Sequence, residues 1–459
     1  MSESAPLLSS FQGASDEFPS VLEGKKVLLA TESWGPVNGV SRTTRSLVEY
    51  LQAHGVDLIL VAPDFKGDAA KQTQSWERRL PGCALPYNPD LTVVYPFHIG
   101  DVYRQAFKPD IIYLASPASL GFQMLLQIRQ LRSSPPVLLN FQTDLSAYSE
   151  IMLPAPLDRF GVWLLGIVQG FLFRSPAVHT IFYPCSAIRG YLEHVGAPTN
   201  RMVQLGRGVD TVLFTPDQRD EAYRQQIAPN GEKILICVCR IAPEKGFEFL
   251  AQVAIRLAAE KIPFKLLIVG GESQPGRRKQ SQATIPDLFL HCSVTETFGL
   301  VVLEAMASGI PVIARDQGGP SDIIRHGQTG FLVPPQDVDQ FTKLTREVSK
   351  NTSHRKKLST AARQQAEDTT WEKINRRAAW QIAEALTNAD QESHSPSRQP
   401  RTGILAWVIE QVCLVLAVGV VYGMWLIAVV PLIVHGHRFL PRAWQALRNQ
   451  FQCSRPLRK

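Results

Sequence analysis

Short apolar runs alternate with longer amphipathic stretches along most of the chain. A run at 26–30 is followed by a polar loop, a helical pattern of apolar positions over 40–54 and a second apolar run at 58–62. The order strand, helix, strand is typical of a parallel, doubly wound sheet. Later apolar runs predict further strands at 111–114, 137–141 and 181–184. Because the carboxyl ends of parallel strands meet at one edge of a sheet, we expect the loops after them to line a cleft.

A second series of the same kind begins near residue 233. It predicts strands at 233–239, 264–270, 287–291, 311–314 and 330–333, with a helix over 247–260. The predicted fold class is therefore α/β, with two Rossmann-like doubly wound domains that face a cleft and hold a ligand between them. We expect the first domain at 24–210 and the second at 211–388, with 211–231 as the connection.

Composition and charge narrow the function classes. The 459 residues, of which 45% are hydrophobic, are enough for two domains with sizeable cores. The net charge of +7 comes largely from the end of the chain, because residues 411–459 contain no Asp or Glu, and we expect no nucleic-acid partner. The seven cysteines show no spacing typical of a zinc site or a disulfide framework, which favours a reducing compartment. Residues 1–23 lack the pattern of a signal peptide, and we expect a disordered tail there.

The apolar stretch 403–434 near the end of the chain is interrupted only by Glu410 and Gln411. Its part after Gln411 is long enough to cross a hydrocarbon core of ~30 Å. A linker rich in Ser, Pro and Gln at 389–402 separates the stretch from the preceding helix. The stretch predicts a transmembrane segment, with a buried helix of the soluble body as the alternative.

The basic tail 435–459 bears on the orientation of this segment. By the positive-inside tendency its arginines favour the cytosol, but Arg398 and Arg401 on the other flank favour the same side, and one span cannot satisfy both. A single-pass anchor, a re-entrant segment and an interfacial helix on an anionic leaflet all stay open. We expect the two-domain body in the cytosol, at the endoplasmic reticulum membrane, because no export signal precedes it.

Two glutamates with seven residues between them give the strongest chemical signal. Glu296 comes just before a predicted buried helix, and Glu304 lies two turns inside it. A helix that starts after Phe298 and Gly299 aims backbone N–H groups and the positive end of its dipole at an anion such as phosphate. A second carboxylate nearby suits a hydroxyl-bearing ligand, so the pair indicates a sugar nucleotide. The alternative for Glu304 is an exposed helix residue, which its apolar neighbours disfavour.

Arg240, Lys245 and Gly39 add to this chemistry. The two cations, at the end of a strand and in the loop after it, suit a leaving diphosphate whose charge grows in the transition state. Their alternative is a solvated surface pair. Gly39 opens a helix and lets the backbone approach a phosphate or sugar, with an ordinary strand-to-helix turn as the alternative.

Together these motifs resemble the family-4 retaining glycosyltransferases, which have the GT-B fold. The resemblance runs from about residue 25 to 372 and is carried by Thr295-Glu296-Thr297-Phe298-Gly299 with Glu304, Arg240 to Gly246, Arg207-Gly208-Val209-Asp210 and Pro36-Val37-Asn38-Gly39-Val40. Within the family, the chain is most similar to the branch of sulfoquinovosyl and lipid mannosyl transferases.

The resemblance implies a reaction and a set of site residues. It implies transfer of a hexose from a UDP or GDP sugar to a hydroxyl of a lipid or hydrophobic acceptor, such as a secondary metabolite, at a membrane, with no cofactor and no metal. Arg240 and Lys245 are expected to grip the diphosphate, Glu304 to hold the ribose hydroxyls and Glu296 a hydroxyl of the donor sugar. The expected donor-binding set also includes Gly39, Phe298, Gly299 and Leu300.

Two departures from the family stand out. Gln142 occupies a position where relatives usually carry a histidine, and an amide can hydrogen-bond but cannot carry a proton at neutral pH. Asp144 after it is a candidate for orienting donor or acceptor, with a helix cap as its alternative, so both residues are expected on the acceptor side. Only 272–286 stand where relatives carry a helix, a strand and another helix, so part of the base pocket is expected to be missing. A catalytically diminished sugar-nucleotide or lipid-binding protein at a membrane is therefore the alternative function.

Overall fold

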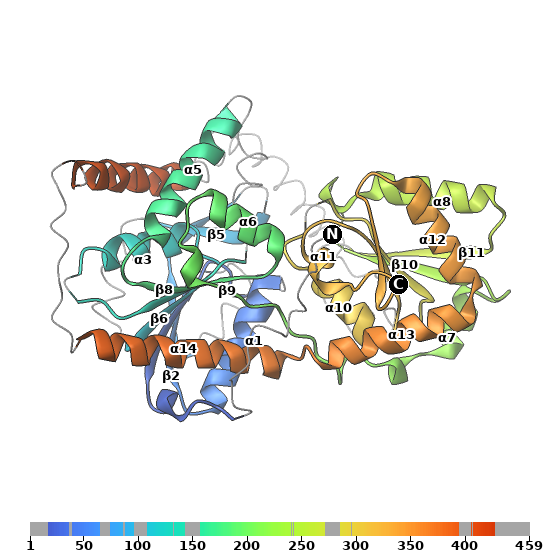
Figure 1. Cartoon of the computed structure of the whole chain (residues 1–459), viewed down its shortest axis with the longest axis horizontal. Coiled ribbons are helices and arrows are strands. Elements are labelled where there is room, and N and C mark those ends of the chain that lie inside the picture. Colours follow the sequence, from blue (N-terminus) through green and yellow to red (C-terminus); the bar gives the residue numbers. More distant parts are fainter. Residues whose placement is uncertain are drawn as a thin grey trace, which may run out of the picture.

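The computed structural model describes residues 17–35, 39–64, 74–85, 88–95, 108–131, 133–142, 157–239, 241, 243–270, 285–294, 296–393, 405 and 407–426. These residues form two α/β domains side by side, and the long helix α14 (Trp371–Ser393) runs from the second domain back across the first (Figure 1).

The first domain is built on a seven-stranded parallel sheet with the order β3-β2-β1-β6-β7-β8-β9. Its strands are β1 (Lys26–Thr31), β2 (Asp57–Pro63), β3 (Glu77–Leu80), β6 (Ile111–Ala115), β7 (Val137–Asn140), β8 (Val178–Tyr183) and β9 (Met202–Gln204). An antiparallel pair, β4 (Gly82–Leu85) and β5 (Asn88–Val94), stands apart from it. The helices of this domain are α1 (Gly39–Ala53), α3 (Ser119–Ile128), α5 (Leu157–Phe173) and α6 (Ser186–His194).

Helices cover both faces of this sheet, which is why its central strands β1, β6 and β7 are largely apolar. One core contains buried residues of α3 and α5, and the core on the other face contains residues of α1 and α14. In α14 the buried side chains Ile374, Ala378 and Ile382 recur every fourth residue and form one apolar stripe. Residues 371–388, expected in the second domain, therefore pack on the first, and the helix continues to Ser393 within the expected linker.

The second domain has a five-stranded parallel sheet with the order β11-β10-β12-β13-β14. Its strands are β10 (Lys233–Val238), β11 (Phe264–Val269), β12 (Leu288–His291), β13 (Val312–Arg315) and β14 (Gly330–Val333). Its helices are α7 (Glu221–Ile227), α8 (Phe247–Ala259), α10 (Leu300–Ala307), α11 (Gly319–Ile323), α12 (Val338–Lys350) and α13 (Thr352–Glu367). Short 3-10 turns lie at Ser20–Leu22, Thr199–Arg201, Pro216–Gln218 and Pro243–Lys245.

The predicted strands are confirmed within one or two residues, with one larger difference. The strand predicted at 181–184 begins at Val178, because it includes the half-buried His179 that the apolar pattern left out. In the described part of the chain β11 is an edge strand, and Ile268 on it is 49% exposed. This edge fits the short connection expected between β11 and β12, although 271–284 lie outside the described residues.

A further helix at Trp407–Leu426 lies against the first domain (Figure 1, red). By length and composition, its 20 residues are enough to cross a membrane. Only a small part of its most apolar stretch is buried against the rest of the protein. The rest of the predicted transmembrane stretch and the basic tail lie outside the described residues.

Candidate active site

Two of the predicted site residues, Lys245 and Glu296, meet at the carboxyl edge of the second sheet. Lys245 ends the turn after β10, and its Nζ donates to Glu296 Oε2 at 3.1 Å and to Ser293 Oγ at 3.2 Å. His291, the last residue of β12, places its Nε2 3.8 Å from the same Glu296 oxygen. The turn after β10, the end of β12 and the loop after it therefore bring together an ammonium, an imidazole and a carboxylate.

The electrostatics of this group keep Glu296 charged. Burial raises the pKa of Glu296, but the contacts with His291 and Lys245 outweigh it and lower the pKa to about 2. Glu296 is thus an acceptor of hydrogen bonds throughout the neutral range, and it holds Lys245 at the edge of the cleft.

Two glycines fix the loops that carry these side chains. Gly246 follows Lys245 with a φ of +70°, and a Cβ there would lie 2.0 Å from the carbonyl oxygen of Cys292. Gly318 has a φ of +67°, and a Cβ there would lie 2.1 Å from the carbonyl oxygen of Glu296. Only glycine fits at either position. The loops that carry Lys245 and Glu296 can therefore pack this closely only because these two residues have no side chain.

Helix α10 begins beside Glu296, as the sequence predicts. Gly299 is the N-cap of this helix and adopts the left-handed conformation. Because glycine has no side chain, it cannot accept hydrogen bonds from the first N–H groups of the helix. Phe298 is buried, and Leu300 lies close to Gly39 of the other domain, since a Cβ on Gly39 would be 3.8 Å from Leu300 Cδ1. The predicted donor-binding residues of the two domains thus face each other.

Glu304 lies on α10 and points to the first domain. Its Oε1 accepts a hydrogen bond from Nη1 of Arg42, which comes from α1. Burial raises the pKa of Glu304, and the charge of Arg42 opposes this shift. Arg42 was absent from the predicted site, because nothing in its local sequence shows that α1 reaches α10.

Arg207 is a second cation that the sequence analysis placed in a motif without giving it a role in the site. Its side chain is buried, and its Cζ is 5.8 Å from the centre of the Phe298 ring. Its Nη1 lies so close to Gly39 that a Cβ at that position would be only 2.8 Å away. Nη2 donates to the carbonyl oxygen of Gln142 at 3.5 Å. Burial lowers the pKa of Arg207 to about 10, while the charge of Glu296 favours its cationic form. Arg207 therefore lies between Gly39 at the start of α1, the end of β7, and the loop that carries Glu296 and Phe298.

Gln142 follows β7 and is buried. Neither its side-chain oxygen nor its nitrogen has a hydrogen-bond partner among the described residues. It lines a small cavity of about 10 Å³ together with Asn140 and Tyr113, which hydrogen-bond each other at 2.7 Å. A buried amide without partners costs free energy, so a ligand or water that pairs with it is favoured.

The structure brings together Lys245, Glu296, Phe298, Gly299, Leu300, Glu304, Gly39 and Gln142 around one junction of the two domains. Arg240 and Asp144 lie outside the described residues, and their roles stay predictions. Among the described residues no group of three or more His, Cys, Asp and Glu side chains is arranged to hold a metal ion.

Comparison with known proteins adds the family. The model "Glycosyltransferase Family 4" matches residues 37–213, and "Glycosyl transferases group 1" matches 279–365. GDP-mannose-dependent alpha-mannosyltransferases of Mycobacterium tuberculosis and Mycolicibacterium smegmatis are 30% and 32% identical over 371 residues, which cover 76% and 75% of this chain and 93% and 94% of the relatives. A sulfoquinovosyl transferase of Arabidopsis thaliana is 30% identical over 73% of this chain and 68% of its own.

Solved structures agree on the fold. Sucrose-phosphate synthase from Thermosynechococcus elongatus superposes with a TM-score of 0.63 at 18% identity over 79% of this chain and all of that one. The Anabaena protein HepE in complex with UDP gives a TM-score of 0.60 at 16% identity over 78% of this chain and all of that one. With its two facing Rossmann-like domains and its relatives matched over nearly their full length, the chain belongs to the family-4 glycosyltransferases of the GT-B fold and is a hexosyltransferase.

Proposed function

We propose that the enzyme moves a hexose, with retention and without a metal ion, from GDP-mannose or a similar nucleotide sugar to a hydroxyl of a membrane lipid. The observation that carries the proposal is the cluster of Lys245, Glu296 and Arg207 where the two domains meet. The donor is chosen because the mannosyltransferases that this chain resembles are GDP-mannose-dependent by name. The lipid acceptor is chosen because the apolar helix at Trp407–Leu426 is long enough to meet a membrane.

Lys245 and Arg207 act on the leaving group in this proposal. Breaking the bond between sugar and phosphate places growing negative charge on the diphosphate, and cations fixed in advance stabilise it without reorganisation. Lys245 is fixed by Glu296 and Ser293, and Arg207 by its burial. The uncapped start of α10 adds backbone N–H donors at the same edge. Arg240 would add a third cation.

Glu296 and Glu304 hold hydroxyl groups of the donor. Glu296, with its pKa lowered to about 2, stays an anionic acceptor for a sugar hydroxyl. Glu304 takes the ribose hydroxyls, and for that the nucleotide must replace Arg42 at its carboxylate. Arg42 is released in this step and becomes available to a phosphate oxygen.

Gln142 and Asp144 lie on the acceptor side in this proposal. The unpartnered amide of Gln142 suits a hydroxyl of the donor sugar or of the acceptor, since it offers both a donor and an acceptor group. It cannot move a proton, so the acceptor proton passes to another group, in a retaining reaction most simply the leaving phosphate.

Binding and turnover with paired variants test the proposal. Detergent-solubilised protein is titrated with GDP-, UDP- and ADP-sugars, and transfer from the bound sugar to a lipid extract is followed by product analysis. We expect saturable binding of one nucleotide, and we expect Glu304→Ala and Lys245→Ala to abolish transfer while the protein stays folded, as shown by an unchanged far-UV circular dichroism spectrum. Lys265→Ala, an exposed lysine of β11, is the matched control and should keep full activity.

The exposed edge of β11 favours one variation of this function. A shortened connection leaves less surface for the nucleotide base, so the donor is expected to bind weakly. If none of the three nucleotide sugars binds, and lengthening the 272–286 segment to that of relatives restores binding, the chain is the diminished sugar-nucleotide or lipid-binding protein instead. Turnover at the level of Lys265→Ala in Glu304→Ala or Lys245→Ala would refute the site itself.

A further inference from the structure

One stripe of the helix at Trp407–Leu426 packs on the first domain. Ala417 and Val421 are completely or almost completely buried in the core that contains α3 and α5. Further residues of the same stripe that pack there are Cys413, Leu414, Leu416, Val420 and Met424. These positions recur every three or four residues, as one face of a helix does. The inner face of the helix is therefore part of the protein core.

Both ends of the helix are fastened to the domain. Near its start, Nε and Nη2 of Arg129 donate to Glu410 Oε1 at 3.2 and 2.9 Å. The guanidinium carbon of Arg129 also lies 4.2 Å from the centre of the Phe171 ring, so this arginine joins α3, α5 and the helix. Near the helix end, the ring of Trp425 packs edge-on to Tyr95 at 6.2 Å. Separating the helix from the domain would break contacts along its whole length.

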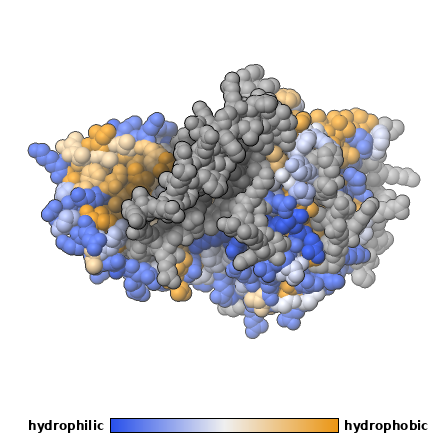
Figure 2. All heavy atoms as spheres, turned by 180° about the vertical axis from the view of Figure 1, so that it is seen from behind, coloured by the Kyte–Doolittle hydropathy of each residue, from blue (hydrophilic) through white to orange (hydrophobic). Residues whose placement is uncertain are grey.

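The outer face of the same helix is apolar and exposed. The exposed residues on it are Leu405, Trp407, Val408, Ile409, Val412, Val415, Val418, Tyr422 and Leu426, between 36% and 74% accessible. Beside it, α5 exposes Phe160 and Trp163, whose rings are 5.7 Å apart. Seen from behind, hydrophobic residues line the upper right of the molecule in the region of this helix (Figure 2). So large a continuous apolar surface needs a nonpolar partner.

The charge of the adjoining sequence indicates the kind of partner, although the residues after 426 lie outside the described part of the chain. Residues 411–459 contain no acidic group, and the tail after the helix carries six basic ones: Arg438, Arg442, Arg448, Arg455, Arg458 and Lys459. On α5, the exposed Arg159 adjoins Phe160. Apolar side chains flanked by basic ones are the pattern of a surface that inserts among anionic lipid headgroups. A protein partner would need acidic groups around an equally long apolar groove.

We propose that the helix at 407–426 lies in the plane of an anionic membrane, with its inner face on the first domain and its outer face in lipid, rather than crossing the bilayer. A crossing helix would have to leave Arg129 and expose the core around Ala417 and Val421 to water. In the plane, both ends of the helix stay on the side of the catalytic body, which reconciles the basic residues on its two flanks. The inference deepens the proposed function, because it explains how a lipid acceptor reaches this body, but it rests on contacts outside the active site.

Vesicle flotation of the full chain tests the surface. The protein is mixed with vesicles of phosphatidylcholine alone or with added phosphatidylglycerol, and we expect binding that increases with the anionic lipid. The variant Trp407→Ser/Ile409→Ser/Val415→Ser removes three exposed side chains and should bind at least about tenfold more weakly, by the area it removes from lipid. Ile255→Ser, at a residue of α8 that is 68% exposed, is the matched control and should bind like the unchanged protein. Equal binding of the triple variant would overturn the proposal.

Topology and docking are measured separately. An epitope added after Lys459 should be accessible to antibody in intact vesicles that carry the catalytic body outside, whereas protection of the epitope would mean that the helix crosses. Arg129→Glu or Glu410→Arg alone should increase hydrogen exchange over 407–426, and the double variant should restore protection; no effect of either single change would refute the docked arrangement. Transfer to a water-soluble acceptor analogue should persist in the triple variant, and its absence from the unchanged protein would count against the proposed function instead.

Discussion

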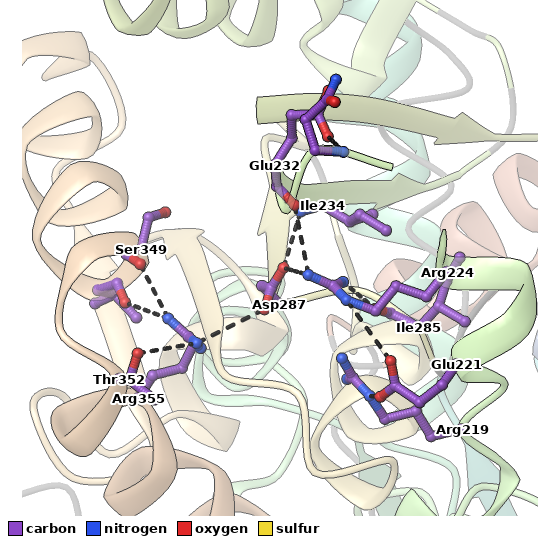
Figure 3. A network of polar contacts seen from close by, with 12 residues as sticks. Arg219, Glu221, Arg224, Glu232, Ile234, Ile285, Asp287, Ser349, Thr352 and Arg355 are labelled. Atoms are coloured by element: carbon purple, nitrogen blue, oxygen red, sulfur yellow. Dashed lines mark hydrogen bonds and ion pairs between the residues drawn. The ribbon is translucent and has the colours of Figure 1, made fainter. Parts of the chain in front are cut away.

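Replacing Asp287 by asparagine should destabilise the second domain without touching the site. Asp287 precedes β12 and is buried, and its Oδ2 accepts from Arg224 Nη2 at 2.7 Å and from the N–H of Ile234 at 2.9 Å (Figure 3). Its Oδ1 lies 3.7 Å from Arg355 Nη2. The carboxylate thus ties α7, the sheet and α13 together next to the short connection after β11. In Asp287→Asn the side chain keeps its shape, but an amide replaces the charge between two arginines.

The cost follows from burial. Removing one partner of a buried ion pair costs ~3–5 kcal/mol. Arg224 keeps a hydrogen bond to the carbonyl oxygen of Ile285 at 2.9 Å, and Arg355 keeps those to Val348 and Ser349, so the lower end, about 3 kcal/mol, is appropriate. For a domain of this size a loss of that magnitude lowers the melting temperature by about 6–12 °C. Differential scanning calorimetry of the full chain would resolve it.

Asp339 offers the matched control. Its Oδ1 also lies 2.7 Å from an arginine, Arg256, but the carboxylate is 89% exposed. Exposed pairs contribute about 1 kcal/mol or less, so Asp339→Asn should lower the melting temperature by at most about 4 °C. In a double-mutant cycle, Arg224→Met should cost much less in the Asp287→Asn background than alone. If Asp287→Asn and Asp339→Asn melted alike, the argument from burial would be refuted.

Three further predictions concern pH and the loops of the site. Glu32 accepts hydrogen bonds from the N–H groups of Ala118 and Gly121, and burial raises its pKa to about 7, against 4.5 in the unfolded chain. The free energy of unfolding should therefore fall by about 3 kcal/mol as pH rises from 4.5 to 7 and stay level above pH 7. Urea unfolding midpoints should show this pH dependence in the unchanged protein and not in Glu32→Gln. Glu296 acts in the opposite direction, because its pKa near 2 adds stability that is present above pH 4.5 and lost as pH falls toward 2, and Glu296→Gln should lack this acid loss in the same assay. Gly246→Ala should lower both the melting temperature and the nucleotide affinity, because its Cβ would clash with the carbonyl oxygen of Cys292. A crystal structure of that variant in which the contact between Lys245 and Glu296 is unchanged would contradict this prediction.

The sequence predicts a strand correctly where the strand is buried on both faces and therefore consists of apolar residues. Strands such as β6 and β13 are buried on both faces, so they are continuous apolar runs that pattern reasoning finds. Strand β3, with the sequence Glu-Arg-Arg-Leu, carries no such signal. Its buried Glu77 pairs with Arg79 of the same strand and accepts from Trp34 Nε1 at 3.0 Å, and the contact with Trp34 comes from another part of the chain. A charged strand of this kind is specified by its tertiary partners.

The candidate site divides along the same line. Lys245 and Glu296 were predicted because each stands beside a turn or helix start that is visible locally, and Glu304 because it is a charged residue within the apolar helix that follows. Arg42 was missed, since its position depends on how α1 faces α10. Arg207 was seen as part of a motif, but its place against Gly39 and Phe298 follows from the packing of three separate segments. Residues that act across the cleft can therefore be found only when the domains are placed together.

The contacts between the domains indicate how the cleft can open. Asp322 of α11 accepts from the N–H and Oγ of Ser186 at 2.6 and 3.0 Å and from Gln204 Nε2 at 3.1 Å, so one carboxylate holds α6 and β9 of the first domain. A second polar contact between the domains is the pair of Arg42 with Glu304, which involves a residue proposed to bind the nucleotide. A ligand replaces the second contact but leaves the first in place. If the nucleotide binds Glu304 as proposed, we expect the domains to open for donor entry about Asp322 while the pair of Arg42 and Glu304 separates, and the bound nucleotide then takes the place of Arg42 at Glu304.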